Sequence, residues 1–153
     1  MKFKELVEFN PKETISKTNI VKKISMDLLE PYTRKISYYT YEYFSGGSKF
    51  RNGDTLMARI TPCLENGKTA YVNILDKNEV AFGSTEFTVI RAKQDVCIDK
   101  FAYYITISSL IRPYAIESMI GSTGRQRVQQ DVLENLEIPY FSLDEQQHIV
   151  NTK

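Results

Sequence analysis

Short runs of apolar residues, separated by turn-forming residues, occupy the chain up to about residue 95. These runs lie at residues 20–26, 36–44, 55–60, 69–72, 80–82 and 85–90. In the last run, Phe87 and Val89 alternate with polar residues, the period-two pattern of a half-buried strand. Glycine, proline, asparagine and aspartate lie between the runs, as tight connections require. The pattern predicts a β-rich first part of the chain.

One of these runs is dense in tyrosine. Tyr39, Tyr41 and Tyr43 alternate along residues 36–44, which predicts a strand with a row of rings on one face. We expect this row to pack against the rest of the sheet, and the alternative is a surface that stacks on bases.

The periodicity changes to a helical one after Asp99, which we expect to be an N-cap. A second helical segment follows over residues 110–119, with Pro113 in its first turn and Gly121 just beyond its end. A further helical turn is expected over residues 130–135. The second part of the chain is therefore predicted to be helical.

The last residues begin another helix. Residues 136–138 suit a short strand, after which Ser142 and Glu145 have the spacing of a capping box. One side of this helix is expected to carry Leu143, Gln147 and Ile149 or Val150. With barely two turns before Lys153, the helix either packs on the domain or is the start of a longer one.

Length and composition fit one ordinary globular domain. The chain has 153 residues, of which 42% are hydrophobic and 25% charged. It has no apolar run near the roughly 20 residues that span a bilayer and no signal peptide, so a cytoplasmic location is expected. Cys63, Cys97 and His148 are too few and scattered for a zinc site, so we expect no metal and no cofactor.

The net charge of +1 is unevenly distributed. Residues 1–70 contain 12 lysines and arginines against 8 acidic residues, and residues 71–153 contain 8 against 11. A DNA-binding protein with one basic face has this kind of asymmetry, although an ordinary solvated surface also scatters charge.

Two polar loops are the candidate binding elements. The first lies between the runs at 55–60 and 69–72, and the second is Gly-Ser-Thr-Gly-Arg-Gln-Arg at residues 121–127. Their hydroxyl, amide and guanidinium groups suit phosphates or base edges, whereas the alternative is a pair of solvated surface loops. The second loop matches neither a Walker loop nor a dinucleotide fingerprint. The candidate DNA-binding residues are Arg59, Thr61, Asn66, Lys68, Ser84, Ser122, Thr123, Arg125 and Arg127.

Catalytic alternatives fit poorly. Asp54, Glu65 and Lys68 superficially resemble a nuclease's metal-binding carboxylates and lysine. That core requires Glu-x-Lys on one strand, and the spacing here is Glu-x-x-Lys, which puts the side chains on opposite faces of an extended chain. Neither a glycine-rich cofactor loop after a strand nor a methyltransferase Asn-Pro-Pro-aromatic motif is present, so we expect no catalytic residue.

Five motifs, taken in order, carry a resemblance to a known family. They are Gly-Asp-Thr-Leu-Met-Ala-Arg at residues 53–59, Gly-Ser-Thr-Glu-Phe at 83–87, Gly-Ser-Thr-Gly-Arg-Gln-Arg-Val at 121–128, Ile-Pro at 138–139 and Leu-Asp-Glu-Gln-Gln-His-Ile-Val at 143–150. This ordered set resembles the target recognition domain of the specificity subunit of type I restriction-modification enzymes.

The resemblance implies an α+β single domain, with a twisted β-sheet or partial barrel, a C-terminal helical segment and the start of a spacer helix. Residues 1–141 would form the recognition domain and residues 142–153 the start of the spacer helix. The domain would read one half of a bipartite target in double-stranded DNA without catalysing a reaction itself.

The resemblance also implies partners. In the family, the spacer helix pairs with its counterpart from a second recognition domain and docks methyltransferase subunits, which a restriction subunit then joins. A second half-subunit or a homodimer through the C-terminal helix would complete the unit, with no membrane involved. The alternative function is a β-rich module that binds proteins or small ligands and not DNA; steep salt dependence of binding would distinguish DNA recognition from it.

Overall fold

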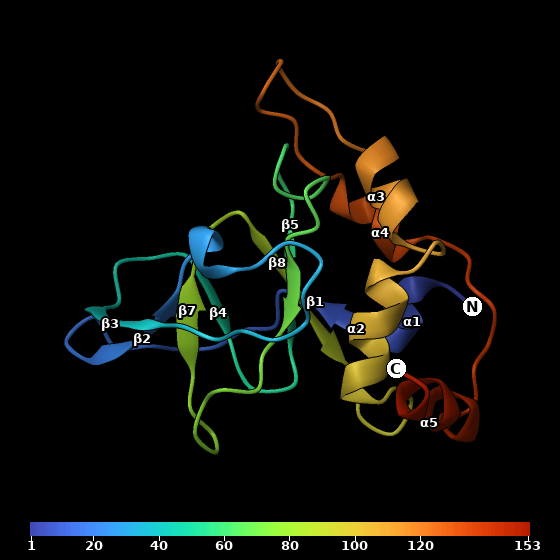
Figure 1. Ribbon diagram of the computed structural model, residues 1–153, viewed down its shortest axis with the longest axis horizontal. Coiled ribbons are helices and arrows are strands. Elements are labelled where there is room, and N and C mark those ends of the chain that lie inside the picture. The colour runs from blue at the N-terminus through green and yellow to red at the C-terminus, as the bar shows by residue number, and fades with distance from the viewer.

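The computed structural model describes residues 1–153 and contains two four-stranded sheets and five α-helices (Figure 1). The strands are β1 (Val7–Phe9), β2 (Ile20–Ile24), β3 (Thr40–Tyr43), β4 (Ser48–Phe50), β5 (Thr55–Ala58), β6 (Thr69–Tyr71), β7 (Ala81–Gly83) and β8 (Phe87–Ala92). The helices are α1 (Phe3–Leu6), α2 (Asp99–Ile107), α3 (Arg112–Glu117), α4 (Gln130–Glu134) and α5 (Leu143–Asn151), with a 3-10 turn, η1, at Met26–Leu28. The predicted α+β class is confirmed, and its β part consists of two open sheets that do not close into a barrel.

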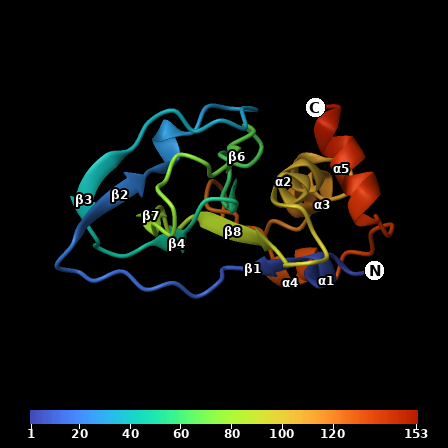
Figure 2. The same cartoon turned by 90° about the horizontal axis from the view of Figure 1, so that it is seen from below.

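The molecule has three layers, with the antiparallel sheet β1-β8-β5-β6 in the middle (Figures 1 and 2). One face of this sheet packs on the helices, where Ile90 of β8 joins Phe101 and Leu133 in one hydrophobic core. The other face packs on the second sheet, where Phe87 and Val89 join a second core. Because β8 lies between the two cores, residues 87–90 are all buried, and the half-buried strand predicted from alternation is wrong.

The second sheet has the order β3-β2-β7-β4, with β2 and β7 parallel. Strand β7 pairs only with the last two residues of β2, so β3 alone pairs with the outer part of β2, and the two form a ribbon at the left end of Figure 1. Tyr41 and Tyr43 are 61% and 60% exposed on this ribbon. The expectation that the tyrosine row packs the sheet is wrong, because the ribbon extends past the core.

The predictions for the second part of the chain hold for the positions of the helices. They fail for one helix cap and for one strand. Pro113 lies in the first turn of α3, and α4 covers most of the expected helical turn. Asp99 is the first residue of α2 and not its cap, since Ile98 occupies the N-cap position. The strand expected at residues 136–138 is reduced to one isolated bridge, between Lys2 and Glu137.

Helix α5 begins as its sequence predicts. The Ser142 hydroxyl accepts a hydrogen bond from the Glu145 amide at 3.1 Å, and the Ser142 amide donates to the Glu145 carboxylate at 3.0 Å. Of the residues predicted on one side, Ile149 and Val150 pack against the core, but Leu143 is 45% exposed, Gln147 is exposed and Gln146 is fully buried. Polar bonding at Gln146 explains this, since a buried amide with satisfied partners is stable in a core.

The side chain of Gln146 joins α5 to the helical layer. Its carbonyl oxygen accepts from the Ile98 amide at 2.9 Å, and its Nε2 donates to the carbonyls of Val96 and Phe141 at 2.9 and 3.0 Å. Helix α5 lies beside α2 at the end of the molecule opposite the tyrosine ribbon (Figure 2). No helix in the structure has both the length and the apolar character that crossing a membrane demands.

Candidate nucleic-acid interface

The two loops singled out in the sequence lie side by side. The Thr61 amide donates to the Gln126 carbonyl at 2.9 Å, and the Val128 amide donates to the Arg59 carbonyl at 2.8 Å. Residues 126–128 therefore run antiparallel to residues 59–61, which follow β5, as an added strand segment with one bridge between Ile60 and Arg127. These bonds fix the base of the second loop against the first.

Beyond this base, the chain on either side of the second loop forms a short ribbon. Ile120 and Arg127 exchange two backbone hydrogen bonds, of 3.1 and 2.9 Å. Gly121 has a φ of +136°, a backbone conformation that L side chains rarely adopt, which explains the glycine at the first turn of the loop. The 121–126 loop projects at the top of Figure 1, and Ser122, Thr123 and Arg125 are exposed in it.

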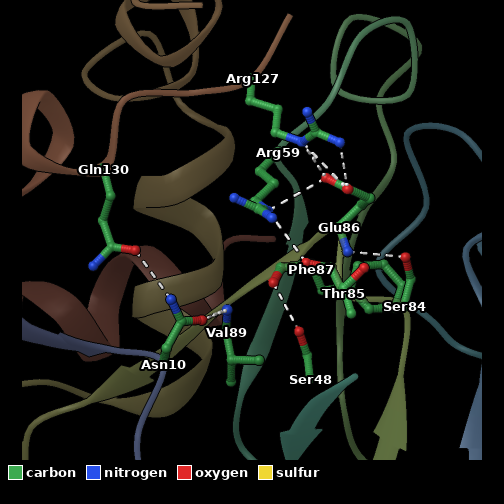
Figure 3. Close-up of polar contacts among 10 residues, drawn as sticks. All are labelled: Asn10, Ser48, Arg59, Ser84, Thr85, Glu86, Phe87, Val89, Arg127 and Gln130. Atoms are coloured by element: carbon green, nitrogen blue, oxygen red, sulfur yellow. Dashed lines mark hydrogen bonds and ion pairs between the residues drawn. The ribbon is translucent and has the colours of Figure 1, made fainter. Parts of the chain in front are cut away.

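Two of the predicted arginines meet on one carboxylate, that of Glu86 (Figure 3). Arg127 donates from Nη2 to Oε1 at 2.9 Å and from Nε to Oε2 at 3.0 Å, a two-pronged contact. Arg59 approaches the same carboxylate, with 3.3 Å between its Nε and Oε2, and donates from Nε to the Thr85 carbonyl at 3.2 Å. Side chains from the residue that follows β5, the 84–86 turn and the ribbon thus form one cluster of net charge +1.

The backbone holds Glu86 in place. The Glu86 amide donates to the Ser84 hydroxyl at 3.0 Å, and the Glu86 carbonyl accepts from the Arg59 amide at 2.9 Å. Hydrogen bonds from Arg127 are the main cause that lowers the pKa of the Glu86 carboxyl below its ordinary value, against the opposing effect of burial. Glu86 is therefore ionised at neutral pH. Ser84, a predicted DNA-binding residue, accepts a hydrogen bond from the Glu86 amide and so helps to position Glu86.

The three remaining candidates belong to the 61–68 loop. The Thr61 hydroxyl donates to the Glu65 carboxylate, and Asn66 is exposed. The Lys68 ammonium donates to the Met26 carbonyl at 3.0 Å, so it braces η1. The structure brings these residues to the same end of the molecule as the arginines, but gives Lys68 and Thr61 protein partners.

A polar hollow of about 590 Å³ adjoins the arginine cluster. Ser84 and Thr85 line it on the side of the cluster, and Lys23 and Lys68 contribute positive charge against the single carboxylate of Asp27. The glycine-rich turn that follows β3 also lines it. The hollow and the exposed loop give this end of the molecule a concave surface with donor groups.

The residues of the nuclease alternative have separate structural roles. Asp54 is 1% exposed and accepts from Arg91 at 2.7 and 2.8 Å, as well as from the Arg51 amide at 2.8 Å. No three histidine, cysteine, aspartate or glutamate side chains are placed to hold a metal ion.

Burial raises the pKa of the Cys97 thiol to about 12, so this thiol is protonated at neutral pH.

Sequence reasoning missed two groups of residues at this end of the molecule. Glu86 is part of the Gly-Ser-Thr-Glu-Phe motif but was not among the candidate DNA-binding residues, because nothing in the sequence places its carboxylate beside Arg127. Arg112 and Tyr32 brace the 61–68 loop by donating to the Glu65 carbonyl at 3.1 and 2.9 Å. The glycine at position 67 was a signal for this packing, since a Cβ there would lie 2.6 Å from the Tyr32 ring.

Known proteins similar to this chain share a family. Over 105 residues it is 37% identical to the type I restriction enzyme EcoAI specificity subunit of Escherichia coli, covering 69% of this chain and 18% of that protein. Over 114 residues it is 36% identical to the EcoEI specificity subunit of Escherichia coli, covering 72% of this chain and 18% of that protein. The chain thus spans about a fifth of the length of these relatives.

A solved structure shares the fold. The crystal structure of the HsdS subunit from Thermoanaerobacter tengcongensis matches with a TM-score of 0.79 and 22% identity, over 99% of this chain and 40% of that chain. The type I restriction modification DNA specificity domain matches residues 1–152. The chain therefore belongs to the family of type I restriction modification DNA specificity domains.

Proposed function

We propose that this chain recognises a short sequence in double-stranded DNA, as one half of the bipartite target of a type I restriction-modification system. The meeting of Arg59 and Arg127 on Glu86, beside an exposed loop rich in donors, is the observation that carries the proposal. Guanidinium groups fixed by the protein suit base edges, because a fixed fork loses little entropy when it binds.

Different parts of the surface have different roles in this proposal. The free donors of the 121–126 loop, Ser122, Thr123 and Arg125, contact phosphates or enter a groove. The hollow lined by Lys23 and Lys68 accommodates a stretch of sugar-phosphate backbone. Asn66, exposed in the 61–68 loop, is a further candidate for contact with DNA.

Helix α5 is the start of the spacer, and residues 142–153 belong to it while residues 1–141 form the recognition domain. The capping box at Ser142 and the anchoring of Gln146 support this division, since they begin the helix sharply and fix its direction. Through this helix the chain associates with a second recognition half and with methyltransferase subunits, which recruit the restriction subunit. The assembly acts on DNA in the cytoplasm, and the chain itself contributes no catalytic group.

The alternative, a β-rich module that does not bind DNA, has one feature in its favour, the exposed Tyr41 and Tyr43. Membership of the DNA specificity family weighs against it. Selection from a randomised duplex pool at low salt tests the proposal. Enrichment of one motif of about 3–5 base pairs supports it. If the chain retains no DNA from the pool and instead binds a protein with an affinity that salt barely changes, the proposal is contradicted and the alternative is favoured.

A further inference from the structure

The contact between Glu86 and Arg127 leaves a particular edge of the arginine available. A guanidinium has five N–H donors in a planar fork. The carboxylate occupies Nε and one side of Nη2, at 3.0 and 2.9 Å. The N–H groups of Nη1 and the far side of Nη2 remain, and they point away from the carboxylate because the group is planar. The side chain is 44% exposed, so this edge is accessible to a ligand.

The free edge matches one base better than the others. Guanine presents two acceptors, O6 and N7, in the major groove, and an arginine contacts both through two parallel N–H groups. Adenine presents one acceptor and one donor there, and the donor opposes an N–H group. Arg127 therefore has the geometry of a guanine-reading residue, since Glu86 binds one edge of its guanidinium and the opposite edge is free for the base.

The charge on Glu86 determines what the two arginines can contact. Its carboxylate neutralises part of their charge, so a phosphate on the same edge gains less attraction and is repelled by Glu86. A neutral base edge carries only partial charges, so Glu86 repels it much less than a phosphate. The carboxylate also restricts the rotation of Arg127, which reduces the entropy lost on binding.

We propose that Glu86 is a positioning residue for specificity, which makes Arg127 a reader of guanine in the major groove and not a phosphate anchor. This inference rests on the proposed function and deepens it. Removing the negative charge would remove the ion pairs of both guanidinium groups, although Arg59 would still donate to the Thr85 carbonyl. Binding to DNA of any sequence would then become tighter while discrimination at the guanine position would fall.

Two variants of Glu86 separate charge from geometry. Glu86→Gln removes the charge and keeps the shape, so it is expected to retain random DNA more tightly, with a salt slope larger by about 1. Its preference for guanine is expected to fall roughly fivefold or more. Glu86→Asp keeps the charge but is one methylene shorter, so it is expected to lose the preference without gaining affinity for random DNA. Thermal unfolding of each variant verifies that it is folded.

A matched control changes the same charge elsewhere. Glu42→Gln breaks the ion pair of Glu42 with Lys23, whose atoms lie 3.3 Å apart on the β2–β3 ribbon. Because it frees Lys23, which lines the proposed backbone-binding hollow, this variant is expected to bind all sequences more tightly and to keep the wild-type preference for guanine. Wild type, both Glu86 variants and the control are taken through the same pool selection, followed by measurement of dissociation constants at three salt concentrations.

The outcomes separate the inference from the function. If wild type enriches a motif and Glu86→Gln enriches it with unchanged preference at every position, the inference is overturned and the proposed function stands. If wild type retains DNA without enriching any motif, the proposed function fails and the inference with it. A loss of guanine preference in both Glu86 variants and not in Glu42→Gln supports the inference.

Discussion

The backbone carbonyl of Arg59 accepts a hydrogen bond from the amide of Val128 at 2.8 Å, and this bond joins the two loops that carry the candidate DNA-binding residues. The position of the arginine cluster depends on it, since the neighbouring residue, Arg127, belongs to the same added strand segment. Changes that distort this segment should impair recognition more than they impair folding.

Gly121→Val tests that dependence. Valine is strained at a φ of +136°, and its Cβ would lie 2.8 Å from the Arg125 carbonyl, so the start of the exposed loop must shift. We expect lost sequence preference in DNA binding with a loss of stability of about 1–2 kcal/mol. Gly124→Asn is the control, because asparagine tolerates its φ of +78° and nothing lies within 4 Å. Equal preference in Gly121→Val and wild type would contradict the prediction.

Arg125→Ala should weaken binding to all sequences alike. Arg125 is exposed in the 121–126 loop, and no protein carboxylate holds its side chain, unlike that of Arg127. A phosphate contact accounts for uniform weakening and for a salt slope smaller by about 1. Dissociation constants for selected and scrambled duplexes, at several salt concentrations, measure both effects. A loss confined to the selected duplex would assign base reading to Arg125 instead.

Gln146→Leu should destabilise the chain by about 2–4 kcal/mol, although leucine is the more hydrophobic residue. The substitution leaves the Ile98 amide and the carbonyls of Val96 and Phe141 without their partner. An orphaned buried group costs about 1–3 kcal/mol, and these part-buried groups regain some bonding to water, so the total is lower than three full costs. Gln147→Leu, on the exposed side of α5, should change stability by less than about 0.5 kcal/mol. Urea unfolding compares the two, and equal stabilities would show that Gln146 does not anchor the helix.

Asp54→Asn should cost about 3 kcal/mol of stability, because it breaks the buried contact of Asp54 with Arg91. Asp76→Asn is the matched control, since the Asp76 side chain is 91% exposed and 3.9 Å from Lys22. Urea unfolding at neutral pH measures both. A structural role predicts unchanged relative preference among DNA sequences in Asp54→Asn, and an altered motif would contradict that role.

The Glu86 cluster should also give a pH-dependent contribution to stability. Arg127 lowers the pKa of Glu86 in the folded chain below its ordinary value of 4.5. The ionised carboxylate therefore stabilises the fold fully above that ordinary value, and the contribution is lost as the pH falls through the lowered one. We expect the melting temperature of wild type to exceed that of Glu86→Gln at pH 7 and the difference to shrink on acidification below pH 4.5. A difference that grows on acidification would contradict the assignment.

The elements of this fold are readable from the sequence because their signals are local. The capping box at Ser142 and the proline in the first turn of α3 act within a few residues, and both predictions are confirmed. The layers are less readable. Alternation in β8 predicts one buried face, but a strand between two cores buries both, and only the tertiary arrangement determines this.

The candidate site follows the same division. The two loops and their arginines can be identified from the sequence, because residue type alone indicates which side chains suit phosphates and bases. The role of Glu86 depends on a contact with a residue distant in sequence, and the use of Lys68 to hold the Met26 carbonyl depends on another. Pairwise contacts of this kind leave no local signal.

The most direct test of DNA reading by Arg127 is a set of four dissociation constants at one salt concentration. Wild type and Arg127→Ala are each measured on the selected duplex and on one in which the most strongly preferred guanine pair is exchanged for adenine·thymine. We expect wild type to lose about 1–3 kcal/mol on the exchange and Arg127→Ala to lose less than about 0.5 kcal/mol. Equal losses in the two proteins, or a selected motif without guanine, would contradict recognition through this residue.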